Sequence, residues 1–243
     1  MTTPADQRPL TILIAADTYP PDVNGAAQFG YRLAKGMTAR GHDVHVLASR
    51  DSKGKSFTEF REEATVHRLR SHRAFTHETF RLCFPWEIKK DISLLFDRVK
   101  PDVVHIQSHY MIGEHVLYEA VKRGVRIIAT NHFMPENLNP FLPFPQWFKD
   151  IIGRVSWKDM GKVMGQADVV TTPTPLAARA MHDHAFLRKV LPLPTASTPQ
   201  PTNSSRANTS SPMPTPPSCL PDAWRRKSMW TCLSRPSARP LRS

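Results

Sequence analysis

Short apolar runs alternate with segments of helical periodicity from residue 11 to about residue 190. The apolar run Thr11–Ala16 is followed by a loop with proline and glycine, and then by Phe29, Leu33 and Met37 at helical spacing. A short apolar run is typical of a buried strand, whereas apolar residues three and four positions apart indicate an amphipathic helix. Strands that alternate with helices form right-handed crossovers and a parallel sheet. The sequence therefore predicts a doubly wound parallel sheet, a Rossmann-like α/β domain.

The same alternation predicts the position of most other elements. Glycine at 41 and 124 and proline at 101 mark where predicted helices end. The expected strands are 42–48, 65–69, 103–106, 125–130 and 169–172, and the expected helices are 88–99, 113–123, 146–165 and 175–184.

The composition changes near Leu193. Residues 193–243 contain ten prolines, no glycine, seven lysines or arginines and one acidic residue, so half of the net charge of +12 lies in this segment. Such a composition cannot bury enough apolar surface to offset the loss of chain entropy. We expect a Rossmann-like domain over residues 1–192 and a disordered tail rich in proline, serine and arginine over residues 193–243.

Several classes of protein do not fit this composition. No apolar run approaches the roughly 20 residues that a membrane span requires, and the N-terminus lacks the order of a signal peptide. Cys83, Cys219 and Cys232 form neither a CxxC pair nor a cluster with histidines, so no metal site is expected. We expect a cytoplasmic protein that can contact the inner face of the membrane.

The loop after the first predicted strand leads from Asp17 through Asn24 to Gly25 at the start of a helix. Ligands of open α/β sheets bind beyond the carboxyl ends of the strands. A glycine at a helix N-terminus lets backbone N–H groups approach an anion, whose charge the helix dipole stabilises. The loop lacks the GxGxxG spacing of dinucleotide-binding proteins. Asn24 and Gly25 are therefore candidates for anion binding, and the alternative is a turn with a helix cap.

Polar segments that contain histidine follow two further predicted strands. Gln107-Ser-His109-Tyr follows one strand, and Asn131-His132, with Glu136 a little later, follows the next. Imidazoles at such positions can hold and deprotonate the hydroxyl groups of an acceptor. A single histidine is more often structural, and Glu136 either orients His132, binds a sugar hydroxyl or only begins a helix.

Basic and aromatic residues gather between Arg68 and Trp86. One interpretation is a loop that contacts an anionic lipid surface or a phosphorylated acceptor. The other is a long loop with a small aromatic core of its own.

These pieces, in this order, resemble the retaining glycosyltransferases of the GT4 type, which have the GT-B fold. The resemblance covers about residues 11–190, and no single segment would suffice to indicate the family. Its main segments are Tyr19-Pro-Pro-Asp-Val-Asn-Gly25-Ala, Lys100-Pro-Asp-Val-Val-His-Ile-Gln-Ser-His, Ile128-Ala-Thr-Asn-His-Phe and Ala167-Asp-Val-Val-Thr-Thr-Pro-Thr.

The resemblance implies a sugar nucleotide, a GDP- or UDP-hexose, held mainly by a second, C-terminal domain. Asn24 and Gly25 would lie near the donor phosphates, and His132 would be the catalytic residue beside the reacting centre. His109, Asn131 and Glu136 would bind the acceptor, a lipid, polyprenol, inositol phosphate or glycan that receives mannose or glucose. Basic residues would stabilise the donor diphosphate in place of a metal, so no cofactor is expected. No specific nucleic-acid partner is expected either.

The tail differs from the corresponding region of family members, because it does not contain their donor domain. If the reading frame is moved back by one nucleotide, the codons of residues 194–198 can also encode Ser-Asn-Gly-Ile-Asp. This sequence resembles the segment that opens the family's donor domain. The codons of residues 222–231 permit Gly-Arg-Leu-Ala-Glu-Lys-Lys-His-Val-Asp, which resembles its donor-phosphate motif. We therefore expect a change of reading frame at about Leu193, and negligible transfer by this chain alone. The alternative is a non-catalytic module whose basic tail holds anionic polymers or a membrane.

Overall fold

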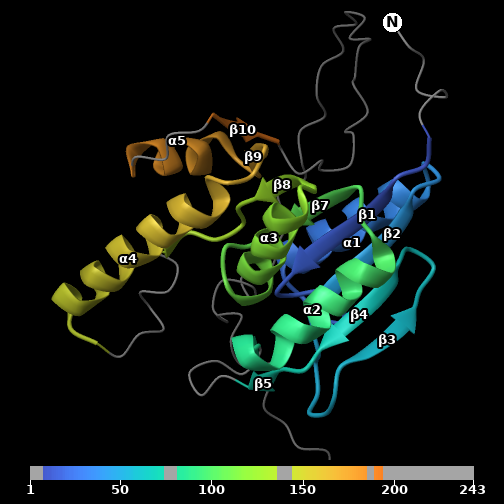
Figure 1. The fold of residues 1–243 in the computed structure, drawn as a ribbon. Coiled ribbons are helices and arrows are strands. Elements are labelled where there is room, and N and C mark those ends of the chain that lie inside the picture. The colour runs from blue at the N-terminus through green and yellow to red at the C-terminus, as the bar shows by residue number, and fades with distance from the viewer. Residues whose placement is uncertain (1–7, 74–80, 136–143, 185–188, 194–243) are drawn as a thin grey trace, which may run out of the picture. The chain divides into compact units, whose positions relative to one another are not determined.

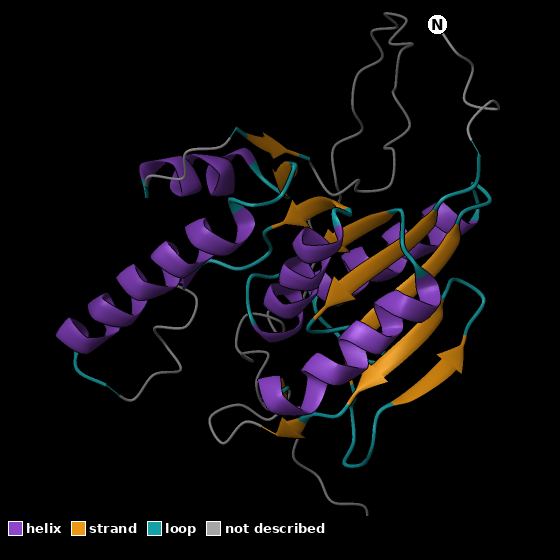
Figure 2. Cartoon of the chain, in the orientation of Figure 1, coloured by secondary structure: helices purple, strands orange, loops and turns teal. Residues whose placement is uncertain are grey.

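A mostly parallel sheet organises the chain (Figures 1 and 2). The computed structural model describes residues 8–73, 81–135, 144–184 and 189–193. Eight strands pair in the order β10-β9-β8-β7-β1-β2-β4-β3. Their bounds are β1 Thr11–Ala16, β2 Asp43–Ser49, β3 Phe57–Phe60, β4 Thr65–Leu69, β7 Val103–Ile106, β8 Arg126–Thr130, β9 Val169–Thr172 and β10 Val190–Pro192. The two-residue strands β5 His72–Arg73 and β6 Arg81–Leu82 pair separately.

Five helices accompany the sheet in the described residues. They are α1 Gly25–Thr38, α2 Pro85–Val99, α3 Met111–Arg123, α4 Gln146–Met164 and α5 Pro175–Asp183. All pairs of the large sheet are parallel except β3 with β4. The predicted doubly wound α/β fold is therefore confirmed.

Successive residues of β1 point to opposite faces of the sheet and so enter two separate cores. Ile12 and Ile14 pack in a cluster with residues of β2 and β4, against which Leu33 and Met37 of α1 lie. Leu13 and Ala15 belong to the larger cluster, which contains the buried residues of α2 and α3. Helix α1 thus covers one face, and α2 and α3 cover the other (Figure 1).

The strand order reverses at β1, because β2 follows on one side of it and β7 lies on the other. Such a reversal opens a crevice at the carboxyl ends of the strands, where ligands of doubly wound proteins bind. The loops that follow β1, β7 and β8 lie at this edge.

Besides the two-residue strands β5 and β6, two strands of the large sheet were not predicted from the sequence. Edge strand β3 has no buried residue, and Phe60 is 85% exposed, so it lacks the apolar face by which a strand is recognised. β10 is only three residues long. The predicted tail, apart from Leu193, lies outside the described residues, so its disorder and the boundary at 193 stay predictions.

Candidate functional site

The loop after β1 ends in a capped helix whose first turn faces open space. The side-chain oxygen of Asn24 accepts hydrogen bonds from the backbone N–H of Ala27 at 2.8 Å and from the hydroxyl of Thr18 at 3.2 Å. A Cβ added to Gly25 would meet no atom within 4 Å. The first turn of α1 contains no acidic residue. Asn24 is therefore a helix cap, as the alternative interpretation held, and the N-terminus of α1 remains open to an anion.

Arg68 holds this loop from inside the protein. Its side chain is 3% exposed and forms an ion pair with Glu59 at 2.9 Å. The guanidinium also donates hydrogen bonds to the carbonyl oxygens of Pro20 and, at 3.2 Å, of Ser49. The ring of Tyr19 is buried beside it, and burial together with Glu63 raises the pKa of the Tyr19 hydroxyl.

The basic stretch that begins at Arg68 binds groups of the chain itself. Arg70 pairs with Glu87 at 3.1 Å, and Arg81 donates to the hydroxyl of Ser71 at 2.7 Å. Aromatic residues at its end stack on one another, Phe84 on Trp86. These contacts favour the interpretation of a loop with its own aromatic packing over a lipid-binding loop. Residues 74–80 lie outside the described ranges.

Gln107 follows β7 and is 3% exposed. Neither its amide nitrogen nor its oxygen has a hydrogen-bond partner within the described residues. A Cβ added to Gly30 of α1 would come within 3.1 Å of both atoms. Because Gly30 has no side chain, α1 lies directly against the buried amide of Gln107.

The next residue, Ser108, links the ends of β1 and β7. Its hydroxyl donates to the carboxylate of Asp17, which also accepts from the backbone N–H of Ile112 at 3.3 Å. Burial raises the pKa of Asp17 to about 6. A Cβ added to Gly113 would lie 2.1 Å from the carbonyl oxygen of Ser108. Asp17 and Gly113 thus fix the turn from which the next residue, His109, projects.

His109 is completely buried, and both ring nitrogens are without a partner in the described part of the chain. Its ring lies against Tyr110, with the centroids 3.7 Å apart. Burial lowers the pKa of His109 to about 4. The imidazole is therefore neutral at pH 7, with one N–H donor and one acceptor nitrogen.

Two predicted site residues follow β8 and differ in their contacts. Asn131 is 2% exposed, its amide nitrogen lies 3.4 Å from the sulfur of Met160, and its oxygen accepts from the N–H of Phe133 at 3.0 Å. His132 has a buried Nε2 without a partner among the described residues. Burial lowers the pKa of His132 to about 4. His132 is the better placed of the two to bind a ligand, while acceptor binding by Asn131 stays a prediction.

A series of hydrogen bonds crosses the sheet beside these residues. His105 Nε2 lies 2.7 Å from the hydroxyl of Thr130, which lies 2.7 Å from the hydroxyl of Thr171. Thr171 donates to the carbonyl oxygen of Ala129 at 3.3 Å. The series joins β7, β8 and β9, so His105 is a structural residue with a partner, unlike His109.

Helix α1 brings the strand ends together. The ring of Phe29 lies 4.6 Å from that of His132 and 6.2 Å from that of His105. Gly30, the next residue, lies against Gln107. The loop after β1, Gln107 and His132 thus converge on the first two turns of α1, whereas Glu136 lies outside the described residues.

Comparison with known proteins shows the family. Residues 23–194 match the family model described as Glycosyltransferase Family 4. The chain belongs to glycosyltransferase family 4. The predicted resemblance is therefore confirmed. No curated protein matches the chain at a significant level.

Solved structures similar to this family 4 domain share little sequence with it. The chain is similar to MurG of Acinetobacter baumannii, with 14% identity and a TM-score of 0.41 over 68% of this chain and 41% of that one. A putative UDP-N-acetylglucosamine 2-epimerase from Listeria monocytogenes has 12% identity and a TM-score of 0.43, over 75% and 44%. An E. coli structure described as trehalose-6-phosphate bound with UDP-2-fluoro glucose has 17% identity and a TM-score of 0.38, over 71% and 42%. The chain therefore spans less than half the length of these proteins.

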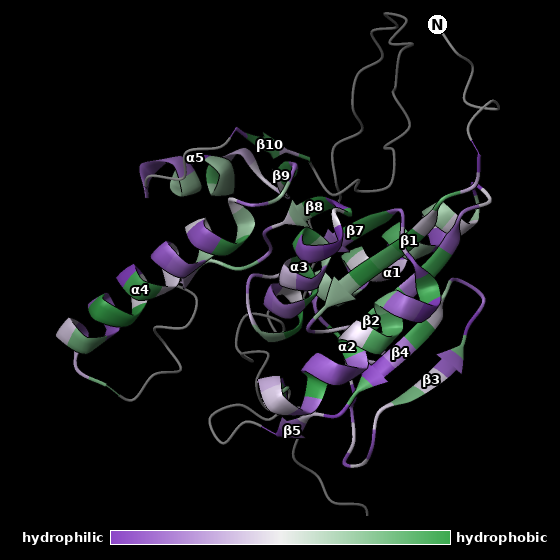
Figure 3. Cartoon of the chain, viewed as in Figure 1, coloured by the Kyte–Doolittle hydropathy of each residue, from purple (hydrophilic) through white to green (hydrophobic). Residues whose placement is uncertain are grey.

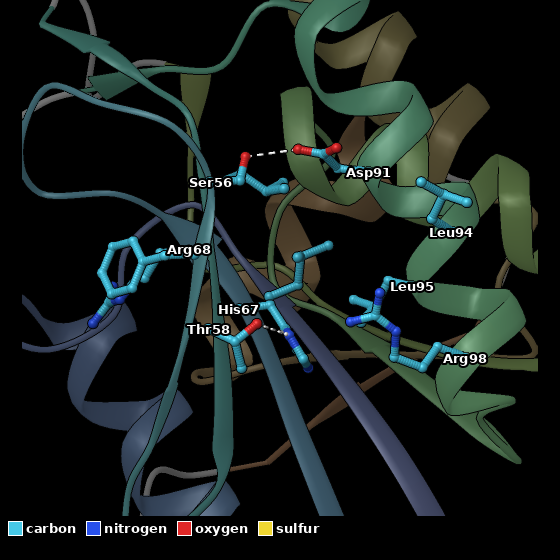
Figure 4. Close-up of a pocket in the computed structure, with 11 residues that line it drawn as sticks. Ser56, Thr58, His67, Arg68, Asp91, Leu94, Leu95 and Arg98 are labelled. Carbon is cyan, nitrogen blue, oxygen red and sulfur yellow. Dashed lines mark hydrogen bonds between the residues drawn. The ribbon is translucent and has the colours of Figure 1, made fainter.

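A pocket of about 230 Å³ lies elsewhere in this family 4 domain, between α2 and strands β2, β3 and β4 (Figure 4). Most of its polar residues already have partners: His67 lies 3.0 Å from both Thr58 and His45, and Asp91 accepts from Ser56 at 2.6 Å. It is also smaller than the roughly 300 Å³ at which ligand pockets begin. We therefore assign the candidate site to the strand ends, where buried polar atoms lack partners.

Among the described residues of this family 4 chain, no three His, Cys, Asp or Glu side chains gather into a group that could hold a metal ion. Within the same residues, none of the helices combines the length and apolar character of a membrane span.

Sequence reasoning missed the roles of Gln107, Gly30 and Gly113. The close approach of α1 at Gly30 could have been predicted, because Ala27, Gly30 and Ala34 form a row of small residues on the buried side of the helix. A row of small residues at helical spacing indicates that a helix approaches its neighbour closely. The lack of partners at Gln107 and His109 has no signal in the sequence.

Proposed function

We propose that this chain is the acceptor-side half of a sugar-nucleotide glycosyltransferase. It would take part in moving mannose or glucose from a GDP- or UDP-hexose to a lipid, polyprenol, inositol-phosphate or glycan acceptor, with retention at the anomeric carbon. The observation that carries this proposal is that Gln107, His109 and His132, which follow β7 and β8 at the same edge of the sheet, have buried polar atoms without partners among the described residues. Buried polar groups of this kind are costly unless a ligand or an ordered water binds them.

A sugar ring matches this group of atoms chemically. Each hydroxyl both donates and accepts hydrogen bonds, as do a neutral imidazole and a carboxamide. Burial lowers the pKa of His132 to about 4, so its imidazole is uncharged at pH 7 and has a lone pair for the proton of a hydroxyl, although the same shift makes it a weaker base. We assign His132 to the reacting centre, His109, Asn131 and Glu136 to the acceptor, and Asn24 with Gly25 to the donor phosphates.

The donor half of the reaction requires a second domain in this proposal. Stabilisation of the leaving diphosphate by basic groups supplies much of the rate enhancement, and these groups would lie in that domain. We propose that the tail from Leu193 is read in a shifted frame, and that the 243-residue chain alone transfers sugar at a negligible rate.

The nucleotide sequence of the gene tests the frame directly. If the alternative frame encodes no continuous domain after codon 193, the proposed frame change is wrong. If it does, the frame-restored protein is expected to transfer sugar from GDP-mannose or UDP-glucose, while the 243-residue chain shows negligible turnover.

A variant of the frame-restored protein tests the site. His132→Ala is expected to lower kcat/KM by about 100-fold or more, the usual effect of losing a positioned acid–base group. His182→Ala, at an exposed position of α5, is the matched control and leaves the rate unchanged. Equal rates for both variants would refute the role of His132.

A further inference from the structure

We propose that the exposed face of α4 docks this domain onto an anionic lipid surface. The inference deepens the proposed function, because it rests on an acceptor that lies in a membrane. Vesicle binding requires no sugar transfer, so its failure would leave the proposed chemistry untouched.

Helix α4 has one face in the core and one face in solvent. Its buried residues include Trp157, Met160 and Val163, which belong to the large core cluster. All five of its buried residues lie in the C-terminal half, and none occurs before Ser156. The N-terminal half extends away from the sheet (Figure 1).

The solvent face of this half is apolar. Trp147, Ile151 and Val155 are 64%, 46% and 62% exposed. Residues four positions apart lie on the same side of a helix, so the three side chains form one stripe. Phe144, 45% exposed, precedes the helix at the end of this stripe. Figure 3 shows hydrophobic, green segments on this outer half of α4.

The same face continues with positive charge. Arg154, Lys158 and Lys162 are exposed and follow the stripe at spacings of three and four residues. None of their side chains has an ion pair or hydrogen bond within the described residues. The acidic residues of the helix, Asp150 and Asp159, lie about a quarter turn to either side of this face at 100° per residue, and Asp150 already accepts from Gln146 at 2.8 Å.

This combination fits an anionic membrane better than a protein partner. A membrane-surface helix has aromatic and aliphatic residues on one side, which enter the headgroup region, and lysine and arginine beside them. Each basic residue near the surface adds attraction to anionic lipids. Protein interfaces, by contrast, are depleted of lysine, and two of the three basic residues here are lysines.

Sedimentation of the 243-residue chain with lipid vesicles tests the proposal. Vesicles of equal parts phosphatidylcholine and phosphatidylglycerol are expected to bind the chain, and pure phosphatidylcholine vesicles much less. The double variant Ile151→Glu/Val155→Glu and the double variant Lys158→Glu/Lys162→Glu are each expected to reduce the partition coefficient about tenfold or more.

Matched controls distinguish α4 from the other basic parts of the chain. Leu176→Glu replaces an exposed apolar residue of α5, and Lys89→Glu/Lys90→Glu reverses two exposed charges of α2. Both are expected to bind vesicles like the wild type. If instead the α4 variants sediment like the wild type, the basic tail binds the lipid and the proposal is wrong.

Fluorescence locates the contact on the helix. Brominated lipids are expected to quench the tryptophan emission of the wild type, and Trp147→Phe is expected to remove most of this quenching. Trp86→Phe, at another exposed tryptophan, is expected to retain it. Light scattering tests whether a second copy of the chain covers α4 instead. If the wild type is a dimer and the Ile151→Glu/Val155→Glu variant is a monomer, a second copy covers α4 and the proposal is overturned.

Discussion

Two neighbouring regions at the same edge of the sheet differ in how their polar groups are paired. Around the loop after β1, Arg68 binds Glu59 and two carbonyl oxygens, and Asn24 caps α1. At the end of β7, Gln107 and His109 are equally buried but have no partner among the described residues. The first region is a scaffold whose polar groups stabilise the fold. The second keeps its polar groups unpaired at a cost in stability, which is typical of binding sites.

The largest effect is expected from breaking the paired region at Arg68. Arg68→Ala leaves Glu59 with Arg61 as its remaining partner, and the carbonyl oxygens of Pro20 and Ser49 without this donor. Loss of one partner of a fully buried ion pair costs about 3 to 5 kcal/mol. We expect the lower end of this range here, because Glu59 is 29% exposed and keeps Arg61. Urea denaturation followed by circular dichroism measures the change. A loss below about 1 kcal/mol would show that water replaces the guanidinium, and that the region is less closed than its contacts indicate.

The next effect concerns the turn that carries His109. Gly113→Ala places a Cβ 2.1 Å from the carbonyl oxygen of Ser108, so the backbone must shift. We expect a loss of roughly 2 to 3 kcal/mol in the free energy of unfolding. Gly153→Ala, where a Cβ meets nothing within 4 Å, is the control. It is expected to stabilise α4 by roughly 0.5 to 1 kcal/mol, and an equal loss for both variants would contradict the close contact at Gly113.

The pH dependence of the free energy of unfolding tests whether the polar groups of the second region are buried without partners. Burial lowers the pKa of His109 from 6.5 to about 4, so the unfolded chain binds more protons between these values. The stability that His109 contributes is present above pH 6.5 and is lost as the pH falls through 4. His109→Gln is expected to make the fall between pH 6 and pH 4 shallower by about 1.4 kcal/mol per pH unit.

A control separates the contribution of His109 from the contributions of other groups that titrate in the same pH range. The raised pKa of Asp17, about 6, acts with the opposite sign, but it is present in wild type and variant alike. His182→Gln, at an exposed position, should leave the slope as it is in the wild type. A wild-type slope for His109→Gln would mean that the His109 ring is hydrated.

The smallest effect is expected at the start of α1. Asn24→Ala removes the cap of the Ala27 N–H and should cost about 1 kcal/mol. Gly25→Ala, with open space around the new Cβ, should change stability by less than about 0.5 kcal/mol. If Gly25→Ala nevertheless weakens the binding of a sugar nucleotide to the frame-restored protein, Gly25 serves the ligand rather than the fold.

The elements of this fold were readable from the sequence because each has a local apolar pattern. Strands β1, β4, β7 and β9 have the predicted bounds, and α2 begins three residues earlier than its first apolar marker because Pro85 suits the first helical position. The site was only partly readable. The sequence places His109 and His132 at strand ends, but their lack of partners depends on how α1 and α3 pack. Arg68, which one interpretation of the sequence assigned to an anion-binding loop, is internal because Glu59 and the loop after β1 meet it from distant positions.

The hydrogen bonds across β7, β8 and β9 have a direction. The carbonyl oxygen of Ala129 can only accept, so when the hydroxyl of Thr171 donates to it, the hydroxyl of Thr130 must donate to Thr171. Thr130 then has only a lone pair to offer His105, whose Nε2 must carry the proton. A backbone carbonyl thereby selects one tautomer of a histidine on a neighbouring strand. Nitrogen-15 chemical shifts of the His105 ring should accordingly report the Nε2–H form throughout the neutral pH range.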